Sequence, residues 1–186
     1  MKSKKIKLAM QWIIVIVILI ICFKVTVFPN GRLSAQRVHE DSERSYYYGP
    51  SEIINTTDLG SSRIYLCRYK NWFSSDTVKK GIVLWYPGKE DGGTEIDYRR
   101  QITYTKSAEG DESGNRLMKI YGYVNDDEVT TICLKNKECF VTEVYELDES
   151  RLFIFCWQDS KDIDYKYLIA ADKDGKVIYK DTIRAF

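Results

Sequence analysis

The stretch Arg151-Leu-Phe-Ile-Phe-Cys-Trp157 decides the fold class, because every residue after the arginine is apolar. An apolar run of this length, rich in aromatic and β-branched side chains, is typical of a strand that is buried on both faces. It therefore predicts a central strand of a β-sheet.

Similar short segments recur on both sides of this strand, and Gly, Asn or Asp residues separate them. No long segment has apolar residues at the 3.6-residue period of a helix. The ten predicted strands cover residues 63–69, 73–79, 81–86, 98–105, 117–124, 129–134, 139–147, 151–157, 167–171 and 177–182. This pattern predicts a mainly β domain with antiparallel pairing, built as a β-sandwich or a strongly bent sheet.

Three segments carry finer expectations. Residues 51–58 could form one short helix, with Ser51 as its cap. Residues 90–93 and 108–115 are predicted to be loops. In the strand over 117–124, apolar residues alternate with Lys119, Tyr121 and Tyr123, which predicts that the second set faces water or is half-exposed.

The chain begins with basic residues that run into an apolar stretch from Leu8 to Phe23. Residues 25–28 extend this stretch past Lys24, so residues 8–28 are long enough for a transmembrane helix. A signal peptidase would need small residues soon after the apolar core, and the chain offers only Leu33-Ser34-Ala35. We therefore expect an uncleaved anchor, with a cleaved signal and a lipid anchor at Cys22 as the alternatives.

Charge predicts how this helix is oriented. Four lysines precede the apolar stretch, so the positive-inside rule predicts a cytoplasmic N-terminus and an extracytoplasmic C-terminal domain at the cell membrane. The predicted organisation is a basic tail at 1–7, a single-pass anchor at 8–28, a polar stalk at 29–50 and a β domain at 51–186.

The net charge of the whole chain is close to zero, but its outer part is acidic. Seven of the 28 Lys and Arg residues lie at or before Arg37, and all 27 Asp and Glu residues lie after it. The outer part thus holds 21 basic and 27 acidic residues, a net charge of about −6. This balance argues against a nucleic-acid partner, which requires clustered basic residues.

Four cysteines follow the anchor, an even number that permits disulfides outside the cell. Cys133 and Cys139 flank a predicted three-residue hairpin loop, which would place them opposite each other within reach of a disulfide. The alternative is that both are small buried apolar residues. Cys67 and Cys156 lie in apolar runs and are interpreted as buried thiols, with a second bridge as the alternative.

The sequence offers little for catalysis. His39 is the only histidine and lies in the predicted stalk, so histidine-based triads and metal sites are excluded from the predicted β domain. The chain has no Gly-x-Gly-x-x-Gly motif, phosphate loop or Ser-x-x-Lys. We therefore expect a protein that is not an enzyme and needs no cofactor or metal.

The acidic clusters at 125–128, 159–164 and 172–176 are interpreted as turns. Asp172-Lys-Asp-Gly175 resembles the opening of a calcium loop, but a strand follows it where a loop would supply further ligands. A hairpin turn with Gly175 at positive φ is the preferred interpretation, and a weak calcium site is the alternative.

Aromatic residues are the one compositional excess, with 14 Tyr and four Trp. Trp72, Trp85, Tyr121 and Tyr123 could form an exposed binding patch. The alternative is that these rings form cross-strand pairs that stabilise the sheet.

Several turn and core segments of the chain resemble small single-pass or secreted β-rich proteins of low-GC Gram-positive bacteria. The segments that carry the resemblance are Arg63-Ile-Tyr-Leu, Thr77-Val-Lys-Lys80, Leu84-Trp85, Tyr121-Gly-Tyr-Val-Asn-Asp126, Arg151-Leu-Phe and Ala171-Asp-Lys-Asp-Gly-Lys-Val-Ile-Tyr179. The resemblance implies a hydrophobic start, a stalk and a β-rich domain, and it assigns no activity and no site residue.

The sequence thus favours a membrane-anchored extracytoplasmic binding module of the cell envelope. The expected partner is an envelope protein or a wall-associated ligand. The alternative is an inhibitor or immunity-type protein that acts at the membrane, and a carboxylate-dependent hydrolase is more remote.

Overall fold

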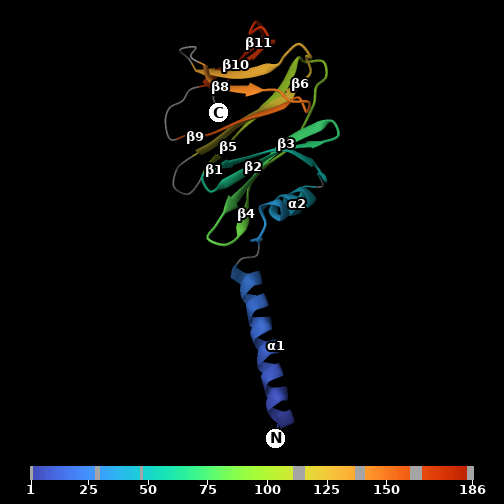
Figure 1. Cartoon of the computed structure of the whole chain (residues 1–186), viewed down its shortest axis with the longest axis vertical. Coiled ribbons are helices and arrows are strands. Elements are labelled where there is room, and N and C mark those ends of the chain that lie inside the picture. The colour runs from blue at the N-terminus through green and yellow to red at the C-terminus, as the bar shows by residue number, and fades with distance from the viewer. Residues whose placement is uncertain are drawn as a thin grey trace.

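The computed structural model describes residues 2–27, 30–46, 48–110, 116–136, 141–159 and 165–183. The described residues form two helices and eleven strands (Figure 1). Their bounds are α1 Lys2–Val27, α2 Ala35–Ser45, β1 Glu52–Leu59, β2 Ser62–Tyr69, β3 Trp72–Lys80, β4 Trp85–Glu95, β5 Ile102–Gly110, β6 Arg116–Val124, β7 Thr131–Asn136, β8 Val141–Glu146, β9 Leu152–Asp159, β10 Tyr165–Ala171 and β11 Val177–Thr182.

The strands form three antiparallel sheets. Their strand orders are β1-β2-β3-β4, β5-β6-β9 and β11-β10-β7-β8. The prediction of a mainly β, antiparallel domain is confirmed. Arg151–Trp157 contributes β9, which pairs with β6 and is buried from Leu152 to Phe155, as expected of a core strand.

The three-stranded sheet lies between the other two. Ile120 and Phe155 on one face belong to a core with the β7 and β10 side chains, whereas Tyr121 and Ile154 belong to a second core with β2 and β3. Figure 1 shows the β1–β4 sheet toward α1 and β10 and β11 at the opposite end. The central sheet therefore has a sheet against each face, and the predicted sandwich is not confirmed.

This arrangement overturns the expected exposure of Lys119 and Tyr121, whereas Tyr123 is half-buried. Lys119 is fully buried and Tyr121 is 1% exposed, because the β1–β4 sheet covers that face. The Lys119 ammonium donates hydrogen bonds to the Ser75 carbonyl oxygen at 3.2 Å and to Thr77 Oγ1 at 3.1 Å. These hydrogen bonds offset the cost of removing the Lys119 charge from water. The alternation of apolar and polar residues along a strand cannot reveal such buried partners.

The predicted polar stalk is wrong where it covers α2. Ala35, Val38, His39 and Glu43 recur at helical spacing and are buried against the β1–β4 sheet. The core between α2 and the sheet also contains Tyr65, Cys67 and Val78. Residues 35–45, which the prediction assigned to the stalk, thus belong to the folded domain.

The predicted helix at 51–58 is also wrong, because these residues form strand β1. The segment is rich in the β-branched residues Ile and Thr, which favour strands. Pairing with β2 along most of its length stabilises the extended form.

Strand β4 differs from the prediction at both ends. It begins at Trp85, so the strand predicted at 81–86 is mostly a tight turn, and it continues through the predicted loop at 90–93. Pro87 is tolerated because β4 is the edge of its sheet and its register against β3 shifts at two places.

Helix α1 stands apart from the sheets (Figure 1). Among the described residues, its segment Ile6–Lys24 is long and apolar enough to span a membrane by length and composition, and none of it is buried inside the protein. The same properties fit a signal sequence near an N-terminus.

Candidate functional site

The structure does not gather the four predicted patch residues into one exposed surface. Tyr121 is a core residue whose ring meets Phe73 edge to face at a centroid distance of 5.8 Å. Tyr123 is half-buried, with the Arg68 guanidinium 5.3 Å from its ring centre. These contacts are those of rings that stabilise the sheets.

The two tryptophans lie at opposite ends of the β3–β4 pair. Trp72 is opposite Glu95 and is 39% exposed, whereas Trp85 is opposite Lys80 and half-buried. The Arg63 guanidinium and the Lys80 ammonium lie 5.2 and 5.7 Å from the Trp85 ring centre. A shared aromatic binding patch is therefore not formed.

The cysteines of the described residues are free thiols. Cys133 lies opposite Val144 in the β7–β8 pair, and Cys139 lies outside the described residues. The predicted hairpin register, which placed Cys133 opposite Cys139, is therefore wrong. Cys67 is fully buried, and burial raises the pKa of the half-buried Cys156 to about 12.

The acidic turns behave as turns where the structure describes them. Asp172 Oδ1 accepts hydrogen bonds from the backbone N–H groups of Asp174 and Lys176, and Gly175 has φ +78°. The cluster at 159–164 lies almost wholly outside the described residues. Within the part of the chain that is described, no three His, Cys, Asp or Glu side chains are placed to hold a metal ion.

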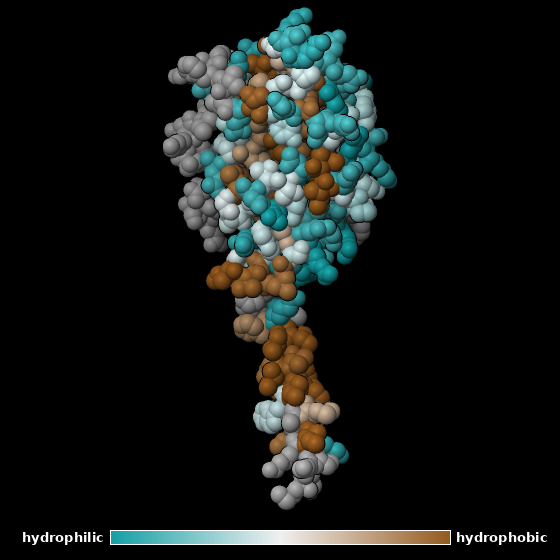
Figure 2. Space-filling view, viewed as in Figure 1, coloured by the Kyte–Doolittle hydropathy of each residue, from teal (hydrophilic) through white to brown (hydrophobic). Residues whose placement is uncertain are grey.

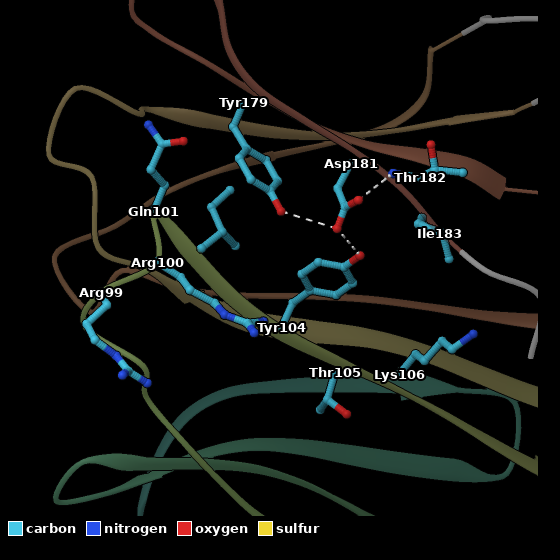
Figure 3. A pocket seen from close by; sticks show the side chains of 11 residues that line it. Arg99, Arg100, Gln101, Tyr104, Thr105, Lys106, Tyr179, Asp181, Thr182 and Ile183 are labelled. Atoms are coloured by element: carbon cyan, nitrogen blue, oxygen red, sulfur yellow. Dashed lines mark hydrogen bonds between the residues drawn. The ribbon is translucent and has the colours of Figure 1, made fainter.

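An open cleft of about 760 Å³ is a candidate binding site (Figure 3). One side comes from the loop that precedes β5 and from the start of β5, and the other comes from the end of β11. The lining residues are Arg99, Arg100, Gln101, Ile102, Tyr104, Thr105, Lys106, Tyr179, Asp181, Thr182 and Ile183.

A carboxylate with two phenols forms the centre of this cleft. The Tyr104 hydroxyl donates to Asp181 Oδ2 at 2.8 Å, and the Tyr179 hydroxyl donates to the same oxygen at 3.3 Å. Figure 3 shows both rings pointing toward Asp181 from different strands. Burial, with the nearby Asp181 charge, raises the pKa of Tyr179 to about 12 and raises that of Tyr104 as well, so both phenols remain protonated donors at neutral pH.

Cationic side chains also line the cleft. The side chains of Arg99 and Arg100 are 90% and 73% exposed, and both also reach Asp97. Lys106 adds a third cationic group to the lining. The cleft therefore combines hydrogen-bonding groups with a cationic rim, which suits a polar ligand that carries a carboxylate or phosphate.

A second polar cluster lies buried between α2 and the β1–β4 sheet, around His39. His39 Nδ1 bonds to Asp76 Oδ2, and Nε2 lies 3.6 Å from Glu43 Oε1 and 3.7 Å from Cys67 Sγ. Burial alone would lower the pKa of His39, but the hydrogen bonds to Asp76 and Cys67, with the charge of Asp76, outweigh it and raise the pKa to about 10. His39 is thus an imidazolium at neutral pH.

The order Cys67–His39–Asp76 matches that of a thiol triad, a chemistry that the sequence analysis excluded because it placed His39 outside the domain. The geometry corrects that exclusion. Cys67 is nevertheless fully buried, and burial raises the pKa of its thiol. A protonated thiol without exposed surface cannot attack a substrate, so the cluster in this conformation joins α2 to the sheet.

Sequence reasoning missed both polar sites. The spacing of Ala35, Val38, His39 and Glu43 could have revealed the buried face of α2 and with it His39. The cleft carries no comparable signal, because its two sides lie more than 70 residues apart along the chain. Comparisons with known proteins add no assignment: no protein family, curated protein or solved structure matches the chain.

Proposed function

We propose that the protein is a single-pass, membrane-anchored binding module of the cell envelope, and that the Tyr104–Asp181–Tyr179 cleft receives its partner. The single observation that carries this proposal is the open cleft, which presents the Asp181 carboxylate, the two phenols bonded to it and a cationic rim to solvent. The partner is an envelope protein with an acidic segment or a wall-associated ligand with anionic groups.

Anchoring by α1 is part of the proposal. The segment Ile6–Lys24 has 19 residues and would extend about 28 Å as a helix, close to the hydrocarbon thickness of a bilayer. The lysines before it and the acidic domain after it favour a cytoplasmic N-terminus and an extracytoplasmic domain at the cell membrane.

Binding is favoured over catalysis by the chemistry of the two polar sites. The cleft joins a carboxylate to two phenols that remain protonated, an arrangement that orients a ligand and supplies no activated nucleophile. Cys67, the thiol that lies beside His39, is buried.

Photo-cross-linking in intact cells tests the proposal. A benzophenone amino acid replaces Gln101, which is exposed and lines the cleft, and in a matched control it replaces Val144 on β8, which is 57% exposed and outside the cleft. We expect a discrete adduct from position 101 that position 144 does not form. Its loss in Asp181→Ala would assign the adduct to the cleft.

Absence of an adduct at position 101, or the same adducts at both positions, would overturn the cleft as the binding site. Mass spectrometry of the adduct identifies the partner. An enzyme or toxin as partner would support the inhibitor or immunity-type alternative in place of a general binding module.

A further inference from the structure

Exposed apolar side chains gather at the end of the domain nearest α1. Ile82 and Val83, in the turn between β3 and β4, are 102% and 70% exposed, and Leu33 is 79% exposed. We call residues 81–84 together with Leu33 the basal tip. Figure 2 shows apolar side chains concentrated where the folded domain adjoins the helix.

The basal tip has a defined structure. The Gly81 N–H donates to the Leu84 carbonyl oxygen at 2.8 Å, which closes the turn. Leu84 packs so closely on Gly31 that a Cβ there would lie 2.8 Å from Leu84 Cδ1. The turn therefore holds Ile82 and Val83 outward while Leu84 fixes its base.

Backbone hydrogen bonds attach the basal tip to the chain that leaves α1. The Arg32 and Trp85 backbones exchange two hydrogen bonds, at 2.9 and 2.7 Å. Arg32 follows the last residue of α1, Val27, by only five positions. Since an extended chain spans at most about 3.6 Å per residue, Arg32 lies within roughly 18 Å of the end of α1, and Trp85 is its paired neighbour.

The charge around the basal tip suits a membrane surface. Lys24 and Arg37 line a small hollow together with Leu33 and Leu84, and Lys80 precedes the turn. Apolar side chains flanked by Lys and Arg are the combination that enters the boundary between headgroups and acyl chains.

We propose that the basal tip is a second membrane contact, in which Leu33, Ile82 and Val83 enter the interface of the same bilayer that α1 crosses. This inference rests on the anchoring by α1 in the proposed function. The contact fixes the orientation of the domain, and it places β10 and β11 at the end that faces away from the membrane (Figure 1). The Asp181 cleft, which β11 helps to form, is then directed toward a partner beyond the membrane surface.

Fluorescence quenching by lipids tests this contact with the full chain in vesicles of phosphatidylcholine and phosphatidylglycerol. An environment-sensitive fluorescent amino acid replaces Val83, and the matched control carries it at Val177, which is 52% exposed on β11. Lipids with a nitroxide near the headgroup should quench position 83 several-fold more strongly than position 177. The paired substitutions Leu33→Asp and Ile82→Asp should abolish this difference.

Flotation of the same samples separates this inference from the proposed function. A chain that fails to float with the vesicles contradicts anchoring by α1. If the chain floats but positions 83 and 177 are quenched equally, the proposed membrane contact of the basal tip is wrong. Anchoring by α1 is still supported in that case. Strong quenching at 83 that survives both aspartate substitutions also overturns it, because the apolar side chains would then not be responsible.

Discussion

At the scale of single residues, the imidazolium of His39 joins two carboxylates from different elements. Asp76 comes from β3, and Glu43 lies one helical turn after His39 on α2. Glu43 also accepts a hydrogen bond from the Ser51 backbone N–H at 3.2 Å, so the cluster reaches the chain that enters β1. The charge of His39 thereby stabilises the contact between α2 and the β1–β4 sheet.

His39→Gln should reduce the free energy of unfolding by about 3–5 kcal/mol, because it leaves the Asp76 carboxylate buried without its cation. Urea denaturation in detergent micelles at pH 6.5 measures this loss. Gln36→Ala, on the exposed face of the same helix, is the control and should change stability by less than about 0.5 kcal/mol. Equal losses in the two variants would contradict a stabilising role for the His39 charge.

Stability should also depend on pH through His39. The pKa of His39 rises from 6.5 in the unfolded chain to about 10 in the folded protein, so its contribution is complete below pH 6.5 and declines as pH rises toward 10. The decline should reach up to about 4 kcal/mol. Denaturation midpoints measured between pH 6 and 10 should fall more steeply for the native chain than for His39→Gln, and parallel curves would refute the raised pKa.

In the cleft, Tyr104→Phe should reduce stability by about 1–2 kcal/mol and weaken cross-linking at position 101, because Asp181 loses its shorter hydrogen bond. Tyr98→Phe provides the control, since its hydroxyl lies on the surface, 3.4 Å from Asn71. Thermal unfolding measures the first effect and adduct yield the second. Unchanged adduct yield in Tyr104→Phe would separate this phenol from ligand binding.

At the scale of elements, local composition predicted most strands correctly. It failed where contacts between distant segments determine the secondary structure. Strands β2, β3, β6, β9 and β11 lie within two residues of their predicted bounds, since each combines β-branched or aromatic residues with clear turn signals. Helix α2 was missed because its buried face includes His39 and Glu43, whose polarity conceals the apolar period. A prediction based on hydropathy misses a buried helix face when its polar side chains pair with one another inside the protein.

The close packing of β5 on β6 at Gly122 helps to position Tyr104 in the cleft. Gly122 lies opposite Tyr104, and a Cβ at this position would lie 2.4 Å from the Thr103 carbonyl oxygen and 2.7 Å from Tyr104 Cβ. Gly122→Ala should therefore reduce stability by about 1–3 kcal/mol through overpacking, and it should displace the Tyr104 ring.

Gly110→Ala is the matched control in the partner strand β5, because a Cβ there meets nothing within 4 Å. It should leave stability unchanged or raise it by up to about 1 kcal/mol. Thermal unfolding of the two variants gives the comparison. A Gly122→Ala variant as stable as Gly110→Ala would show that β5 and β6 shift apart easily.

At the scale of the whole molecule, three sheets share two cores. The sequence identifies the apolar faces, but which sheet covers each face depends on contacts between distant segments, such as Lys119 with Ser75 and Thr77. The candidate site was unpredictable for the same reason, because Tyr104 and Asp181 meet only after the sheets have stacked. The apolar helix α1 was evident from the sequence, because its signal is local and continuous.

The central claim is that α1 anchors the chain and presents the domain outside the cell. Protease treatment of intact cells that carry a C-terminally tagged chain tests it most directly, with the size and location of the tagged species read on a gel. We predict a full-length, membrane-bound species whose tag is lost when protease is added to intact cells. A tag that is degraded only after permeabilisation would contradict the orientation, and a shorter tagged product in the medium would contradict the anchor.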